Sequence, residues 1–324
     1  QVKMVRAIAR VMMNSSLGRG LSRITSALGG SEAIDLALRC ILNPGDEVII
    51  PVPSFVCYGP LTSMAGGTPV YVELKAENEF RLTAAQLRAA LTPRTKAVVL
   101  PFPSNPTGGI LERADLEALA GVLKDTNAMV LSDEIYAELT YGQKHVSPAN
   151  LPELYDRTIV VNGFSKSHAM TGWRIGYACA NDVIAKVMAN YVSHSTGSPV
   201  AISQRAAAVA LSGSQAEIET MRQAFEQRRN YIVERMNAIP GVSCIQPEGA
   251  FYVMMNLEQL LGKTIHGVEI TNDDVFADAF LKYGLVAVVP GSGFGAPNFV
   301  RWSYATSMEN IKEGLDRLEK FLAE

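Results

Sequence analysis

Short apolar runs alternate with longer amphipathic segments along the first two thirds of the chain. Apolar residues that recur every three to four positions predict helices at Glu32–Leu42, Ala84–Leu91 and Arg113–Lys124. The β-branched runs between them predict the strands Glu47–Pro51, Pro69–Val72, Ala97–Leu100, Ala128–Ser132, Thr158–Val161 and Ile175–Ala180. This alternation is typical of an α/β fold, in which helices sandwich a mostly parallel sheet.

The last third of the chain has a different pattern. It becomes helical from about Ser198, and a long helix is predicted at Gln215–Ala238. The elements predicted after it are strands at Ala250–Asn256, Val286–Val289 and Val300–Tyr304, and helices at Asp273–Tyr283 and Met308–Ala323. We therefore expect a large domain in residues 23–213 and a smaller α+β domain in residues 214–324. Residues 1–22 are predicted to form a helix that packs with the small domain.

Composition narrows the class of protein. The chain has 324 residues, is 48% hydrophobic, and carries a net charge of −3 from 29 basic and 32 acidic residues. With no basic block, neither nucleic acid nor an anionic membrane is the expected partner, and a small molecule fits better. No apolar run reaches the roughly 18–20 residues of a membrane span, and no signal-peptide pattern is present, so we expect a cytoplasmic protein.

Cysteine and histidine spacing gives no sign of a metal site. The four cysteines lack a C-x-x-C pair and are predicted to be small core residues, and the four histidines show no ligand spacing.

Lys166 is the first candidate for chemistry. It follows a β-rich run at Thr158–Asn162 and precedes Arg174 by eight residues. A lysine can hold an aldehyde cofactor covalently while a nearby arginine binds the phosphate of that cofactor. This arrangement suggests pyridoxal phosphate.

Two further segments supply groups that such a cofactor needs. Gly29, Gly30 and Ser31 open a helix, where free N–H groups and the helix dipole favour a phosphate; an ordinary N-cap by Ser31 is the alternative. Asn105 follows the strand Ala97–Leu100, and its amide can donate to a phenolate oxygen; a simple turn is the alternative.

Two more segments carry charged groups in apolar surroundings. Asp133 follows the strand Ala128–Leu131, where a carboxylate can keep a pyridine nitrogen protonated, with Tyr136 on the same side; a helix N-cap is the alternative. Arg301 lies inside an apolar strand, and a substrate carboxylate matches its guanidinium; an internal salt bridge is the alternative.

Together these residues resemble the fold-type I pyridoxal phosphate-dependent aminotransferases of class I/II, which include bacterial aspartate and aromatic amino-acid aminotransferases. The resemblance runs from about Gly29 to the end, and its most specific parts are Ser132–Tyr136 and Phe164–Gly176. It implies ping-pong transfer of an amino group between an L-amino acid and a 2-oxo acid in a homodimer.

The resemblance also implies roles for single residues. Lys166, Asp133 and Tyr136 are the catalytic residues that it implies, with Lys166 as the lysine that binds the cofactor and moves the proton. Asn105 and Arg301 would bind the substrate. The cofactor would be held by Gly29, Gly30, Ser31, Phe55, Asn105, Asp133, Tyr136, Ser165, Lys166 and Arg174.

The sequence departs from the family near its start. Before the helix that aligns with Met4–Met12, the family has a segment that covers the substrate and a tyrosine that reaches the partner subunit's phosphate; neither is present here. Ser22–Leu28 is also a poorer strand former than the family's β-branched strand. Three activities stay open: transamination, lyase or synthase chemistry on the same scaffold, and cofactor binding with little turnover.

Overall fold

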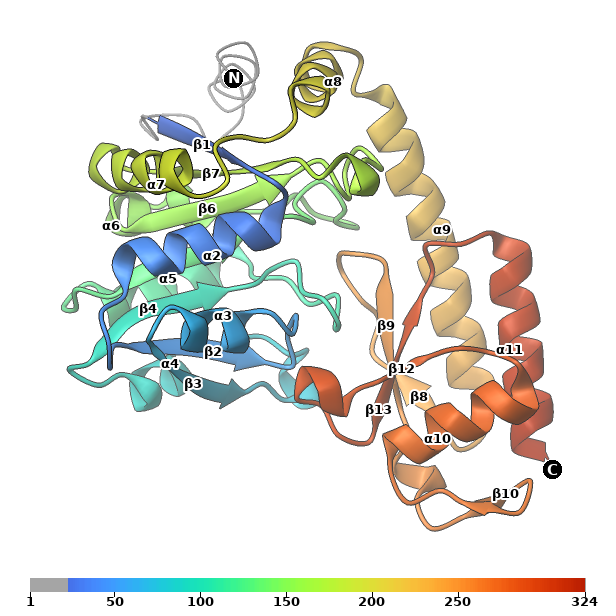
Figure 1. The fold of residues 1–324 in the computed structure, drawn as a ribbon. Helices are drawn as coiled ribbons and strands as arrows, with labels where there is room; N and C mark the ends of the chain where they lie inside the picture. The colour runs from blue at the N-terminus through green and yellow to red at the C-terminus, as the bar shows by residue number, and fades with distance from the viewer. Residues whose placement is uncertain (1–22, 324) are drawn as a thin grey trace.

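The computed structural model describes residues 23–323, so the predicted helix in residues 1–22 lies outside the described part (Figure 1). Seven strands form one sheet in the order β1-β7-β6-β5-β4-β2-β3. β7 runs antiparallel to β1 and β6, and the remaining neighbours pair in parallel. The strands are β1 Arg23–Ala27, β2 Glu47–Val52, β3 Thr68–Glu73, β4 Thr95–Leu100, β5 Met129–Asp133, β6 Thr158–Gly163 and β7 Gly176–Ala180. The predicted mostly parallel sheet is confirmed.

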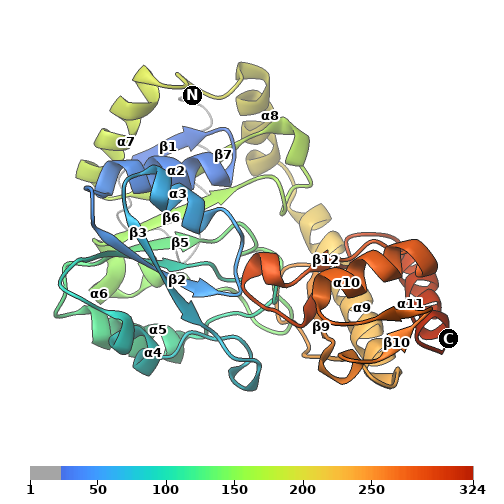
Figure 2. The same cartoon turned by 60° about the horizontal axis from the view of Figure 1, so that its bottom comes forward.

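Helices cover both faces of this sheet (Figure 2). They are α2 Gly30–Ile41, α3 Tyr58–Met64, α4 Ala84–Ala90, α5 Arg113–Leu123, α6 Pro152–Tyr155, α7 Asp182–His194 and α8 Ala201–Ser212. On β2, Val48 and Ile50 pack into a core with α2 and α7, whereas Ile49 packs into a core with α4 and α5. Because both faces are covered, the strands are continuous apolar runs, which is why the sequence pattern identified them.

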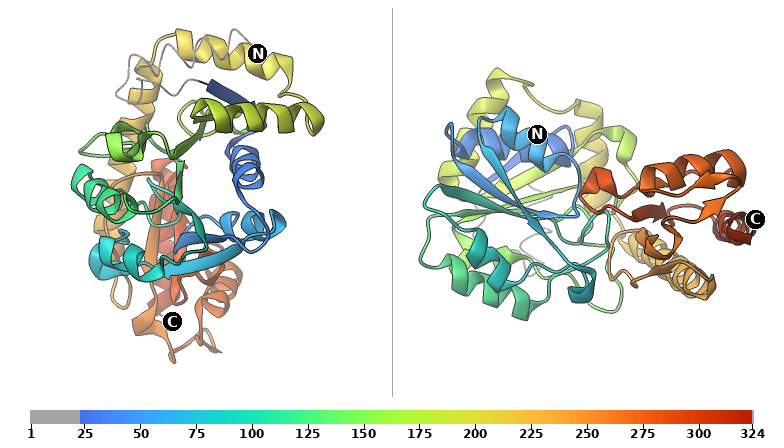
Figure 3. Two further views of the ribbon diagram at one scale, coloured as in Figure 1. Left: turned by 90° about the vertical axis from the view of Figure 1, so that its left-hand side faces the viewer. Right: turned by 90° about the horizontal axis from the view of Figure 1, so that it is seen from below.

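A second, smaller sheet stands beside the first (Figure 3). Its antiparallel strands follow the order β12-β13-β9-β8, and a separate hairpin joins β10 and β11. The strands are β8 Ser243–Cys244, β9 Tyr252–Asn256, β10 Thr264–Ile265, β11 Val268–Glu269, β12 Val289–Pro290 and β13 Phe299–Ser303. The helices α9 Ala216–Ala238, α10 Asp273–Ala279 and α11 Met308–Ala323 share one apolar core with this sheet. The division at residues 213 and 214 stays a prediction.

Two predicted elements differ in the structure. Most of Val286–Val289 is not a strand. Leu285 ends the preceding helical turn with a left-handed backbone (φ 54°), the N–H of Val286 donates back to the carbonyl of Phe280, and the ladder of β12 starts only at Val289. The helix predicted at Asp273–Tyr283 ends as α10 at Ala279 and continues as a π-helical turn, Phe280–Gly284.

The segment Ser22–Leu28, a poor strand former by sequence, contains β1. Its strand pairs residue by residue with β7, from Arg23 opposite Ala180 to Ala27 opposite Gly176. Pairing and burial decide the conformation here, because intrinsic β-propensity is weak compared with packing against neighbours. β1 leads directly into the turn before α2, so this pairing positions the start of that helix.

Candidate functional site

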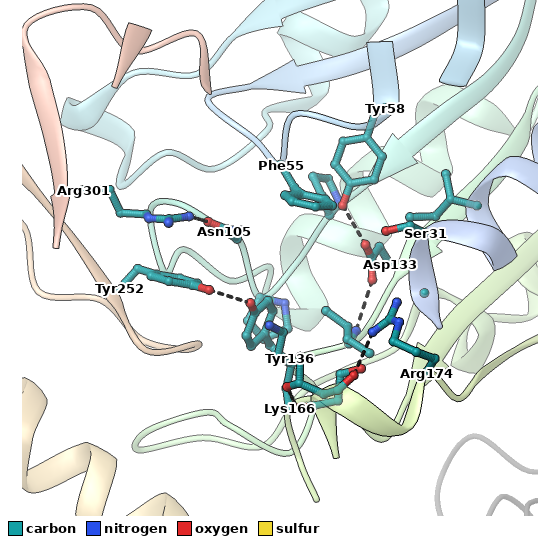
Figure 4. A pocket seen from close by; sticks show the side chains of 17 residues that line it. Ser31, Phe55, Tyr58, Asn105, Asp133, Tyr136, Lys166, Arg174, Tyr252 and Arg301 are labelled. Carbon is teal, nitrogen blue, oxygen red and sulfur yellow. Dashed lines mark hydrogen bonds between the residues drawn. The ribbon is translucent and has the colours of Figure 1, made fainter. Parts of the chain in front are cut away.

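The carboxyl ends of the parallel strands meet at one edge of the large sheet, where ligand sites of α/β folds form. A pocket of about 290 Å³ opens there, and side chains from both sheets line it (Figure 4). Its lining includes every predicted site residue except Gly29, namely Gly30, Ser31, Phe55, Asn105, Asp133, Tyr136, Ser165, Lys166, Arg174 and Arg301. Segments far apart in the sequence therefore converge as the motifs predicted.

Gly29 does not line the pocket but lies next to it, beside Arg174. It precedes α2, and a Cβ atom on it would lie 2.6 Å from Nη2 of Arg174. Glycine thus leaves room for the guanidinium beside the helix start, and its backbone (φ 119°) is one that other residues rarely adopt. No side chain caps α2, so its first N–H groups, Ser31 and Arg174 together form a cradle for an anion.

Gly176 packs closely against the backbone turn that forms this cradle. A Cβ atom on Gly176 would lie 2.7 Å from the carbonyl carbon of Gly29 and 3.0 Å from the backbone nitrogen of Gly30. Both contacts are with backbone, so the neighbours can yield only if the turn before α2 moves.

We therefore expect Gly176→Ala to lose about 1–3 kcal/mol of unfolding free energy in urea titration, because a methyl group is forced into a packed site. Gly172→Ala is the matched control, since the space around Gly172 is open and its Cβ would meet nothing within 4 Å. Equal stabilities of the two variants would contradict this account of the cradle.

Asp133 is the last residue of β5 and is only 7% exposed. Its Oδ2 accepts a hydrogen bond of 2.7 Å from the hydroxyl of Tyr58, and its Oδ1 accepts one of 3.2 Å from the backbone N–H of Ile135. Burial raises the pKa of Asp133, and the Tyr58 hydrogen bond acts in the opposite direction. A cationic group placed against this carboxylate would stabilise its ionised form.

Lys166 lies after β6 and is partly buried beside aromatic rings. Its Nζ is 5.7 Å from the ring centroid of Tyr136 and 5.6 Å from that of Phe251. Burial, and then the positive charges of Arg301 and Arg174, lower the pKa of this amine, while Asp133 opposes the shift. A lysine with a lowered pKa can act as a nucleophile and as a base.

Arg301 reaches the pocket from β13. Its Nη1 donates a hydrogen bond of 2.7 Å to Oδ1 of Asn105, and its guanidinium carbon lies 4.3 Å from the ring centroid of Tyr252 and 4.7 Å from that of Phe294. Its buried Nε has no hydrogen-bond partner within residues 23–323. The alternative of an internal salt bridge is not seen among these residues, so the guanidinium is available to an external carboxylate.

The sequence did not identify Tyr58 or Tyr252 as site residues. Tyr58 lies three positions after Phe55, and the two rings pack edge to face with centroids 6.2 Å apart. The hydroxyl of Tyr252 lies 3.1 Å from that of Tyr136. The contact of Tyr58 with Asp133 and that of Tyr252 with Tyr136 join distant segments. The only local signal was the position of Tyr58 three residues after Phe55, at the start of α3.

The pocket fits pyridoxal phosphate. It combines a cradle for a phosphate, a buried carboxylate for a ring nitrogen, an aromatic face at Phe55 and an amine of lowered pKa. Within the described part of the chain, no cluster of three His, Cys, Asp or Glu side chains is placed to hold a metal ion. Among residues 23–323 we find no candidate for a membrane-spanning helix.

Comparisons with known proteins identify the family of this chain. Residues 5–318 match the family model of aminotransferase class I and II. The aspartate aminotransferase of Geobacillus stearothermophilus is 46% identical over 93% of this chain and 76% of its own length. The aspartate/prephenate aminotransferase of Cereibacter sphaeroides is 45% identical over the same shares.

A solved structure extends the agreement to three dimensions. The crystal structure of the aspartate aminotransferase from Rhizobium meliloti superposes with a TM-score of 0.95 at 41% identity, over 99% of this chain and 82% of that one. The chain therefore belongs to aminotransferase class I and II and is a pyridoxal phosphate-dependent transaminase that acts on amino and 2-oxo acids.

Proposed function

We propose that the chain transfers the amino group of L-aspartate to a 2-oxo acid, with 2-oxoglutarate as the test acceptor. The observation that carries the α-carboxylate part of this proposal is Arg301, a half-buried guanidinium held between two rings, with no carboxylate partner in residues 23–323. Aspartate as the donor is supported by the relatives, several of which are aspartate aminotransferases at 44–46% identity.

We assign the residues around the cofactor by their positions in the pocket. Asp133 would hold the ring nitrogen, Asn105 and Tyr136 the phenolic oxygen, and Phe55 the ring face. The cradle of Gly29, Gly30, Ser31 and Arg174, with Ser165 beside Lys166, would hold the phosphate.

Pyridoxal phosphate, when bound, supplies an electron sink for the electron pair left at the substrate Cα. Lys166 would be the base that moves a proton between the substrate Cα and the C4′ carbon of the cofactor, because its amine has a lowered pKa and lies in the pocket. Arg301 and Asn105 would hold the α-carboxylate, which fixes the direction of the Cα–H bond relative to Lys166.

A donor panel tests the choice of substrate. With 2-oxoglutarate as acceptor, kcat/KM for L-aspartate should exceed that for L-alanine and L-phenylalanine by about tenfold or more, as expected if a charged contact recognises the second carboxylate of aspartate. An aromatic donor that outperforms aspartate would overturn this assignment while leaving transamination itself intact.

The assembly proposed here is a homodimer. Apolar side chains are exposed on α7, on α8 and at the residue before α8, namely Val183, Val187, Tyr191, Val200, Ile202 and Val209, and a partner subunit would cover such a surface. Sedimentation equilibrium should give twice the mass of one chain. A monomer at assay concentrations would contradict the proposal.

We also propose a cytoplasmic location. The support is chemical: Cys40, Cys57, Cys179 and Cys244 are all free thiols, as expected in a reducing compartment. Cell fractionation that places the protein elsewhere would contradict it.

Tyr58→Phe tests the role of Asp133. Without the Tyr58 hydroxyl, the pKa of Asp133 should rise further, because burial already raises it and this hydrogen bond opposes the shift. As pH falls, the carboxylate of the variant would then become protonated at a higher pH than that of the wild type. The acid limb of cofactor binding should move up by about one to two pH units, from the value of a hydrogen bond to a charged group.

The control for Tyr58→Phe is Tyr155→Phe. The Tyr155 hydroxyl is buried but has no hydrogen-bond partner in the described chain, so its removal breaks no contact of Asp133. An unshifted acid limb in Tyr58→Phe would show that Tyr58 does not tune the carboxylate.

A further inference from the structure

Tyr252 contacts two residues of the pocket, Arg301 through its ring and Tyr136 through its hydroxyl. It opens β9, and β9 pairs with β13 so that Met254 lies opposite Arg301 and Tyr252 opposite Ser303. Alternate residues of a strand share a face, so Tyr252 is the diagonal neighbour of Arg301 on the same face. The register thus brings the Tyr252 ring to 4.3 Å from the guanidinium carbon of Arg301.

The hydroxyl of Tyr252 reaches the other sheet. It lies 3.1 Å from the hydroxyl of Tyr136, and both side chains are buried, at 7% and 4% exposure. Figure 4 shows this pair between Arg301 with Asn105 on one side and Lys166 on the other. Tyr252 is therefore in contact with one residue assigned to the substrate and one assigned to the cofactor.

Counting hydrogens decides which tyrosine donates. A phenol has one O–H and can both donate and accept. If Tyr136 gives its proton to the phenolic oxygen of the cofactor, it has none left for Tyr252, so Tyr252 must be the donor in the pair. A donor to Tyr136 also polarises its O–H and strengthens its own donation.

The ring of Tyr252 has a separate effect. Arg301 is held between Tyr252 and Phe294 instead of by a carboxylate. The ring faces attract the guanidinium and fix its plane without neutralising its charge. Its hydrogen-bonding edge therefore stays available to a substrate carboxylate.

We propose that Tyr252 is a positioning residue of the transaminase: its hydroxyl directs the proton of Tyr136 toward the cofactor, and its ring fixes Arg301 for the substrate carboxylate. This inference rests on the roles proposed above for Tyr136 and Arg301. The two functions belong to different parts of one side chain, so the hydroxyl can be removed alone and the ring can be removed together with it.

Tyr252→Phe removes only the hydroxyl. When Lys166 holds the cofactor, its Nζ would lie next to the phenolic oxygen of the cofactor. A hydrogen bond donated to that oxygen lowers the pKa of the nitrogen, so a weaker hydrogen bond from Tyr136 should raise this pKa. We expect the pH midpoint of the visible absorbance of the holoenzyme to rise by about 0.5–1 unit, from the value of one neutral hydrogen bond. The dissociation constant of succinate, an unreactive dicarboxylate, should change less than about twofold, because the ring remains.

Tyr252→Leu removes the ring as well. The same absorbance midpoint should rise, and succinate should bind about 3- to 30-fold more weakly, as expected for the loss of a buried cation–π contact. Asp133, Lys166, Arg174 and Arg301 are the charged groups that line the pocket with these tyrosines, and both variants retain all four. Tyr283→Phe, at an exposed tyrosine that stacks on His266, is the control and should change neither quantity.

The outcomes are distinguishable. If the wild type shows no visible band that titrates, the cofactor assignment itself fails. If the wild type titrates normally and Tyr252→Phe has the same midpoint, the hydroxyl has no directing role. If Tyr252→Leu binds succinate as tightly as the wild type does, the ring does not position Arg301.

Discussion

Replacing Lys166 with alanine is expected to give a folded protein that lacks the visible absorbance of the lysine-bound cofactor. Transamination should fall by at least about a thousandfold, because the same amine binds the cofactor and moves the proton. The absorbance spectrum and the rate with L-aspartate and 2-oxoglutarate measure the two effects. An unchanged visible band in Lys166→Ala would refute the assignment.

A second variant shows that the loss is chemical and not structural. Lys166→Met keeps the length of the side chain and removes its charge. Burial lowers the pKa of Lys166 from its ordinary value of 10.5, so in the cofactor-free protein the buried charge costs stability below the lowered pKa. That cost is relieved as pH rises through the lowered pKa toward 10.5.

Lys166→Met should therefore be more stable than the wild type without cofactor, and most clearly at low pH. The difference in urea unfolding should narrow as pH rises through this window. A variant that is less stable than the wild type at every pH would mean that Lys166 holds the fold together.

Replacing Arg301 with leucine should reduce kcat/KM for every amino donor by about 30- to 5,000-fold. This range corresponds to about 2–5 kcal/mol, the usual cost of removing one partner from a buried hydrogen-bonded charge pair. All amino acids carry an α-carboxylate, so the loss should not depend on the side chain of the donor. Arg301→Lys should recover only part of the rate, because an ammonium cannot bind a carboxylate with two parallel hydrogen bonds.

The control for Arg301 is a primary amine that lacks a carboxylate. Its slow reaction should be the same in Arg301→Leu and in the wild type, since it never uses the guanidinium. Arg317→Leu, which removes an exposed ion pair of 2.8 Å with Glu313, should leave kcat/KM for aspartate unchanged. An equal loss for the amine would indicate a general disturbance of the pocket.

The strands of the large sheet were predictable because covering helices bury them on both faces. That burial requires continuous apolar runs such as Val48–Val52, which a sequence shows directly. β1 was not predictable in this way, since its conformation depends on pairing with β7 and its own residues favour a strand only weakly. At Val286, the backbone N–H donates to the carbonyl of Phe280 and not to a neighbouring strand, a contact that the local apolar pattern does not reveal.

The site shows the same division. Asp133 and Arg301 are charged groups next to or within apolar strands, and a sequence reveals such residues because burying an unpartnered charge is costly. Lys166 was found from its place after a β-rich run and eight residues before Arg174. Tyr58 and Tyr252 are aromatic residues among many others. Their contacts with Asp133 and Tyr136 span 75 and 116 positions of the chain, so only the folded arrangement distinguishes them.

The most direct test of the central claim is the product formed by the holoenzyme from L-aspartate with no 2-oxo acid present. Transamination predicts one equivalent of oxaloacetate per Lys166 site and no free ammonia, because the amino group stays on the enzyme until an acceptor arrives. Added 2-oxoglutarate should then restart oxaloacetate release. Continuous release of product together with ammonia, without any acceptor, would contradict the account and indicate lyase chemistry in this pocket.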